Sequence, residues 1–160
     1  MRITVHAVGR MKSGPERELA ARYFDRFSKA AGPLGLSAGP LIEIAESRAR
    51  DDRQRCREEA AKLLALRETG ARIVALDETG KSLTSQDFSQ LLARERDTGT
   101  RELVFAIGGA DGHDPAVLET AAAIVSFGRM TWPHQFARIM LAEQLYRAAT
   151  ILAGHPYHRA

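Results

Sequence analysis

The sequence predicts an α/β protein with a mostly parallel sheet of five to six strands and helices on both of its faces. Five short apolar runs alternate with segments in which apolar residues recur at helical spacing, and this alternation is typical of such folds. The chain of 160 residues is 44% hydrophobic and 27% charged. This composition favours one globular domain over residues 1–160, large enough to bury a core.

In the first half of the chain, three strands and two helices are predicted. A strand over 3–8 is followed by Gly14-Pro15, and Pro at the first helical position favours a helix there, which Gly32-Pro33 ends. A second strand covers 41–44. A charged helix then runs over about 51–68 and closes at Thr69-Gly70, and a third strand covers 73–76.

The second half repeats the pattern. A helix is predicted over 85–96 and a strand over 103–107, which runs into Gly108-Gly109. Asp114-Pro115 combines an N-cap residue with Pro at the first helical position, so a short helix should follow to about residue 122. A fifth strand covers 124–127. The terminal helix begins at Pro133, with Thr131 expected to cap it.

Three strand ends are expected to meet at one edge of this sheet. In open parallel sheets, ligands bind outside the carboxyl ends of the strands. These ends are Leu76-Asp77, Ile107-Gly108 and Phe127-Gly128. Each is followed by residues that let the backbone come close to a ligand, so the sequence predicts a binding site there.

Two segments resemble nucleotide motifs and are interpreted otherwise. Residues 75–82 satisfy a relaxed phosphate-loop pattern. However, the carboxylates of Asp77 and Glu78 would face the phosphates, and no helix obviously starts at Lys81. An exposed turn is therefore expected after Asp77. The Gly-rich segment 108–112 lacks dinucleotide-binding spacing and is interpreted as a tight turn. Its position at the end of a buried strand also makes it a candidate for the ligand site.

The last quarter of the chain carries most of the unusual side chains. Residues 129–160 contain Trp132, three His and two Tyr, together with four Arg and one Glu, while the other residues balance at 19 basic against 19 acidic. Side chains that stack on bases, bind phosphates and titrate near neutrality suit an RNA-modifying site. The spacing of Trp132, Phe136 and Met140 also fits a helix face in the core or at a subunit contact.

Other sequence features narrow the class of protein. The lone Cys56 excludes an intrachain disulfide and has no partner for a zinc pair, and the tail histidines lack further ligands, so no metal site is predicted. His6 is expected to be structural and His113 a loop residue. Neither a leader nor a run long enough to span a membrane is visible. A soluble, cytoplasmic protein is therefore expected.

The motifs together resemble the SPOUT-class methyltransferases, and among them the small bacterial enzymes that methylate N3 of a pseudouridine in large-subunit ribosomal RNA. The resemblance covers essentially the whole chain, and the ending His155-Pro156-Tyr157-His158-Arg159 is its most specific part. The other matching segments are Val8-Gly9 with Lys12, 73–77 with Gly80-Lys81, 105–109, 130–134 and 142–148.

The resemblance implies a C-terminal trefoil knot, a homodimer, and S-adenosylmethionine as cofactor. The substrate would be the pseudouridine at position 1915 of 23S rRNA in the assembled ribosome. The cofactor residues would be Leu76, Gly108, Phe127, Gly128, Arg129, Met130, Thr131 and Trp132. Candidate catalytic residues are Arg147, His155, Tyr157 and His158, and candidate RNA-binding residues are Lys12, His134, Arg138 and Arg159.

The chain departs from the family pattern at Ala110, where proline is common, and at Phe127-Gly128, which replaces a more usual Leu-Ser. These changes bear on loop stiffness and cofactor affinity. Two alternatives stay open at this point. One is a related methyltransferase that acts on tRNA or another rRNA position, and the other is a catalytically silent RNA-binding protein.

Overall fold

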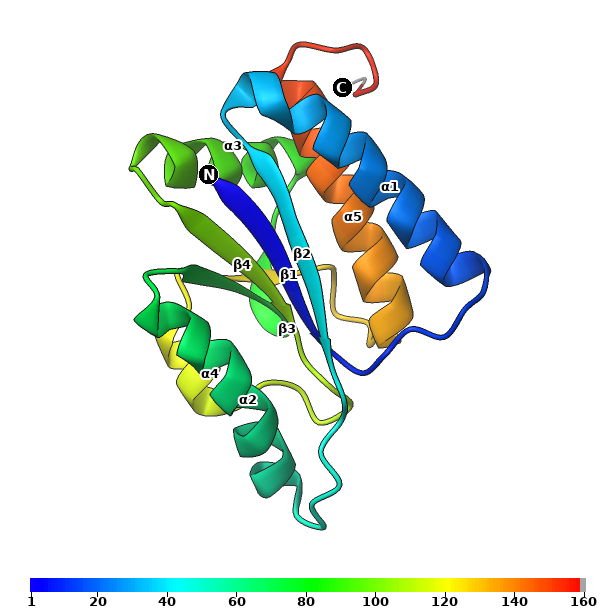
Figure 1. The fold of residues 1–160 in the computed structure, drawn as a ribbon, viewed down its shortest axis with the longest axis vertical. Coiled ribbons are helices and arrows are strands. Elements are labelled where there is room, and N and C mark those ends of the chain that lie inside the picture. The colour runs from blue at the N-terminus through cyan, green and yellow to red at the C-terminus, as the bar shows by residue number, and fades with distance from the viewer. Residues whose placement is uncertain (159–160) are drawn as a thin grey trace.

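A five-stranded, fully parallel sheet forms the centre of the computed structural model, which describes residues 1–158 (Figure 1). The strand order is β2-β1-β4-β3-β5. The strands are β1 (Arg2–Val8), β2 (Ser37–Ile44), β3 (Arg72–Ser82), β4 (Glu102–Ile107) and β5 (Ala123–Ser126). All five predicted strands are present, and the parallel pairing is confirmed.

Helices cover both faces of the sheet, as predicted (Figure 1). The helices α1 (Pro15–Ala31), α3 (Ser85–Asp97) and α5 (His134–Leu152) pack on one face, and α2 (Asp52–Glu68) and α4 (Pro115–Thr120) on the other. A short 3-10 helix, Gly32–Leu34, follows α1. Local signals set several starts: Asp51 and Asp114 cap α2 and α4, and Thr84 forms a capping box with Asp87.

The central strands divide their side chains between two cores because successive residues of a strand point to opposite faces. In β4, Leu103 and Phe105 join the cluster under α1, α3 and α5, whereas Val104 and Ala106 join the cluster under α2 and α4. These four residues are fully buried. The sheet is therefore held rigidly between its two layers, and its strand ends are fixed points on which loops can build a site.

The strand β3 continues beyond its predicted end and pairs with β5 a second time. Val125 pairs with Leu76 and, after a shift in register, also with Lys81. Gly80 lies beside this second contact, where an added Cβ would come within 2.7 Å of the backbone of Ile124 and Val125. The exposed turn expected after Asp77 is wrong, because residues 77–82 belong to β3, although Thr79 donates to Asp77 as in an Asx turn. The trefoil knot stays a prediction.

The start of α5 differs from the sequence-based expectation. The helix begins at His134, Pro133 occupies the N-cap position, and no side chain caps the helix. The expected cap from Thr131 is therefore wrong, because Pro133 sets the turn into the helix without a side-chain hydrogen bond.

Among the described residues, none of the helices combines the length and apolar character needed to cross a bilayer.

Candidate cofactor-binding site

A cavity of about 910 Å³ opens where the three predicted strand ends meet. Residues from the ends of β3 and β4 and from the loop after β5 line it together, as the parallel topology predicts. The loop after β2 and the first turns of α5 complete its wall. The predicted cofactor residues that line it are Leu76, Gly108, Phe127, Met130, Thr131 and Trp132.

The segment 108–112 forms the turn expected at the end of β4. The Gly112 N–H donates to the Gly109 carbonyl over 3.1 Å, and the two residues also form an isolated bridge. A Cβ at Gly108 would lie 2.9 Å from the Gly112 carbonyl carbon, and a Cβ at Gly109 would lie 2.9 Å from Oε2 of Glu59. The paired glycines are therefore needed for this turn to lie against α2 and leave the cavity open.

The loop after β5 presents apolar surface at the cavity. Gly128 has φ +115°, which favours glycine, and its N–H and carbonyl both bond the Ser126 hydroxyl. Met130 is 71% and Trp132 42% exposed, although both are large apolar side chains. Gly128 and Arg129 do not line the cavity. Their part in cofactor binding stays a prediction.

The charge of the cavity lining separates classes of ligand. Four carboxylates line it, from Glu46, Asp77, Glu78 and Asp111, whereas no Lys or Arg does so among the described residues. A polyphosphate would be repelled by such a wall, whereas a ligand with positive charge would be attracted.

Within residues 1–158 no cluster of three or more His, Cys, Asp or Glu side chains has the arrangement of a metal site.

Two histidines lie at the cavity. His113, expected to be a loop residue, has its Nε2 3.2 Å from the Leu76 carbonyl oxygen, and burial lowers its pKa. His134 lies beside Arg138 with its Nδ1 3.2 Å from a guanidinium nitrogen. Burial and the Arg138 charge lower the pKa of His134, which favours a neutral ring. Sequence reasoning missed His113 at the site because only the fold returns this residue to the end of β3.

The C-terminal candidates form a separate cluster. Glu143 accepts hydrogen bonds from Arg147 at 2.5 and 2.9 Å and from the Tyr157 hydroxyl at 3.2 Å. The Arg147 guanidinium also lies 5.0 Å from the centre of the Tyr157 ring. The His155 backbone N–H donates to Thr150, and Nδ1 of His158 is buried without a hydrogen-bond partner among the described residues.

The C-terminal tail of this cluster follows the end of α5 that is farther from the cavity (Figure 1), whereas Glu143 lies in the middle of that helix. The cavity touches the first turns of α5, and a helix of 19 residues is about 28 Å long. None of the described tail residues lines this cavity in its own chain. Glu143, which Tyr157 contacts, lines a neighbouring cavity together with Phe127 and Gly128. The homodimer that the sequence implies stays a prediction.

The predicted RNA-binding residues differ in their exposure and contacts. Lys12 is exposed in the loop after β1, whereas Arg138 has no exposed surface. The Arg138 guanidinium bonds Glu43 and the carbonyl oxygens of Val8 and Gly9. The prediction that Arg138 contacts RNA is wrong for this chain, since its donors serve to fix the end of β1. Arg159 lies outside the described residues.

The fold and the site define a methyltransferase of the SPOUT class. The family model described as "Predicted SPOUT methyltransferase" matches residues 1–158, and the chain belongs to this family. It is therefore an enzyme whose methyl donor is S-adenosylmethionine.

Relatives named "Ribosomal RNA large subunit methyltransferase H" match over the full length. The protein of Mesorhizobium japonicum is 56% identical over 160 residues, that of Brucella anthropi 57% and that of Sinorhizobium fredii 58%, and each alignment covers 100% of both chains.

Proposed function

We propose that this protein transfers a methyl group from S-adenosylmethionine to N3 of a pseudouridine in 23S rRNA of the assembled ribosome, at position 1915. The acidic cavity at the three strand ends is the observation that carries the proposal. The names of the full-length relatives support the choice of large-subunit RNA as substrate. The cytoplasm is the corresponding place of action.

The cavity suits S-adenosylmethionine in shape and charge. Apolar side chains such as Leu76, Phe127 and Met130 would enclose the adenine and the methylthio group. The carboxylates in the lining would favour the sulfonium and ammonium charges and accept from the ribose hydroxyls. When bound, the cofactor supplies an electrophilic methyl group on a positively charged sulfur.

The residues of the protein would act mainly by positioning. A displacement with a neutral leaving group needs no acid for that group, and orientation alone can lower such barriers by about 7–11 kcal/mol. The target imide must lose its proton, and an anion then needs stabilisation. Arg147 is a candidate for the anion, and His155 and His158 are candidates for the proton.

Tyr157 fits a hydrogen-bonding role better than a basic one. Burial, a hydrogen bond with Tyr23 and the charge of Glu143 raise the pKa of Tyr157 to about 12. The hydroxyl therefore keeps its proton at neutral pH and can donate. The Tyr157 ring also packs on Tyr146, with centroids 4.7 Å apart, which would hold the tail in place.

The active unit would be a homodimer in which the tail of one chain completes the cavity of the other. The distance between tail and cavity within one chain supports this arrangement. The partly exposed side chains of Trp132 and Phe136, at 42% and 47%, provide apolar surface at the mouth that a second chain would cover. Lys12 and His134 are the described candidates for contact with RNA.

The substrate test uses radiolabelled S-adenosylmethionine with ribosomes, naked 23S rRNA and tRNA from cells that lack the modification. Labelling of assembled ribosomes in preference to the other two supports the proposal. Labelling of tRNA or naked rRNA would assign the enzyme to another RNA. Sedimentation in the same buffer should give a dimer, and a fully active monomer would contradict the composite site.

A further inference from the structure

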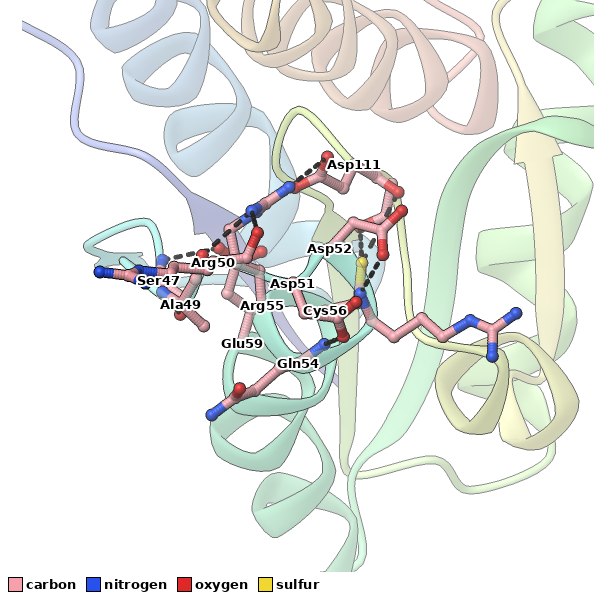
Figure 2. A network of polar contacts seen from close by, with 12 residues as sticks. Ser47, Ala49, Arg50, Asp51, Asp52, Gln54, Arg55, Cys56, Glu59 and Asp111 are labelled. Carbon is pink, nitrogen blue, oxygen red and sulfur yellow. Dashed lines mark hydrogen bonds and ion pairs between the residues drawn. The ribbon is translucent and has the colours of Figure 1, made fainter.

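The first two turns of α2 carry a polar network that ties two loops together (Figure 2). Arg55 is its centre. The Arg55 guanidinium donates to both carboxylate oxygens of Asp111, at 2.6 and 3.0 Å, and to the carbonyl oxygens of Ala49 and Arg50, at 3.0 and 3.1 Å. One side chain thereby joins the turn after β4 to the loop between β2 and α2.

Neighbouring residues of α2 strengthen the same connection. Glu59, one helical turn beyond Arg55 and 8% exposed, accepts from the Ser47 N–H at 2.8 Å. Its other oxygen lies so close to Gly109 that a Cβ there would approach it to 2.9 Å. The Cys56 thiol contacts the Asp111 carbonyl at 3.6 Å. This face of α2 thus bears on both loops at several points.

Both of these loops form part of the cofactor cavity. Glu46 lines it from the loop after β2, and residues 108–112 line it from the turn after β4. Arg55 does not itself line the cavity. A change at Arg55 would therefore act on the cofactor only through the position of these two wall segments.

The chemistry of the contact requires arginine. A planar guanidinium can hold a carboxylate with two donors and still offer others to carbonyl groups, whereas a lysine ammonium acts as a single point. The Arg55 and Asp111 side chains are 27% and 33% exposed, so the pair adds little to global stability. Its effect is expected to be local, on the turn after β4 and the loop between β2 and α2.

We propose that Arg55 is a positioning residue that sets the spacing of two walls of the cofactor cavity by holding Asp111 and the β2–α2 loop together. The inference rests on the proposed use of this cavity for S-adenosylmethionine. We call the contacts of Arg55 with Asp111 and the β2–α2 loop the clamp. Loss of the clamp would let the Gly108–Gly112 turn move and so weaken cofactor binding. The methyl transfer step at saturating cofactor would be preserved.

The test compares S-adenosylmethionine binding by calorimetry and methylation kinetics on ribosomes for the wild type, Arg55→Ala and Arg55→Lys. Arg57→Ala is the matched control, because it removes the same charge from an exposed position of α2. Arg55→Ala should raise Kd and KM for the cofactor about tenfold and leave kcat within about twofold. Arg55→Lys should fall between the wild type and Arg55→Ala, and Arg57→Ala should match the wild type.

The outcomes separate the two proposals. A wild type that binds no S-adenosylmethionine would refute the use of the cavity. A wild type that binds, together with an Arg55→Ala protein of equal affinity, would overturn the clamp alone. Equal losses in Arg55→Ala and Arg57→Ala would also overturn it, since they would indicate a charge effect. If Arg55→Ala does not fold, the comparison of the wild type with Arg55→Lys decides, and equal affinities of these two proteins would refute the clamp.

Discussion

A fall in pH should lower the free energy of unfolding of this protein through His6 in β1. The substitution His6→Leu should abolish the share of this loss that His6 causes. His6 is 2% exposed in β1, and its Nε2 has no hydrogen-bond partner among the described residues. It lines a small buried cavity together with Cys56, Glu59 and His113. Burial, and then the positive charges of His113 and Lys62, lower the pKa of His6 from 6.5 to about 4.

The direction of the change in stability with pH follows from proton binding. Between these two pKa values the unfolded chain binds a proton at His6 and the folded chain does not, so this contribution to stability is complete above 6.5 and is lost as the pH falls toward 4. With 1.36 kcal/mol for each unit of pKa, the wild type should lose about 2 kcal/mol between pH 7 and pH 5 from His6 alone.

Urea unfolding followed by circular dichroism at the two pH values measures this loss. The lowered pKa values of His113 and His134 contribute in both proteins, so the difference between wild type and His6→Leu isolates His6. His155→Leu, at an exposed position, is the control for the exchange of a histidine for a leucine. Equal losses in wild type and His6→Leu would refute the reasoning.

Three further substitutions test other parts of the structure. Arg138→Ala should cost about 1–3 kcal/mol in urea unfolding, because the carbonyl oxygens of Val8 and Gly9 lose the buried donor that they share; unchanged stability with weaker RNA binding would instead restore the RNA role. Gly80→Ala should lower the free energy of unfolding by ~1–3 kcal/mol in the same assay, since its Cβ meets backbone, and an unchanged value would contradict the close approach of β3 to β5 at Gly80. Glu143→Gln should lower kcat on ribosomes and leave the cofactor Kd unchanged, because Glu143 orders Arg147 and Tyr157; unchanged kcat would remove this cluster from catalysis.

The elements and the location of the cavity were accessible from sequence because they follow local rules. Apolar runs, caps and glycines marked the strands and helices within a few residues. Parallel topology then required that Leu76, Gly108 and Phe127 meet at one edge, and the cavity lies there.

The role of Arg138 could have been inferred from spacing. It lies three and seven residues before Leu141 and Leu145, on the same buried face of α5. A charge on that face needs a partner, but nothing in the sequence indicates Glu43, which is 95 residues away. The path of β3 past Gly80 likewise depends on a strand that comes much later in the chain.

The contacts of His113 and Arg55 were also beyond sequence reasoning. His113 reaches the end of β3 across 37 positions, and Arg55 reaches Asp111 across 56. The separation of the tail from the cavity depends on the length and direction of α5. Sequence motifs named both groups of residues, but only the fold shows that the cavity and the tail lie toward opposite ends of α5.

The most direct test of the proposed function is to incubate the purified protein with S-adenosylmethionine and ribosomes that lack the modification, and then to map added methyl groups by mass spectrometry. One methyl group on N3 of a pseudouridine in the large-subunit RNA is the predicted result. Absence of any methyl group on that RNA, with cofactor binding demonstrated in the same preparation, would contradict the proposed substrate.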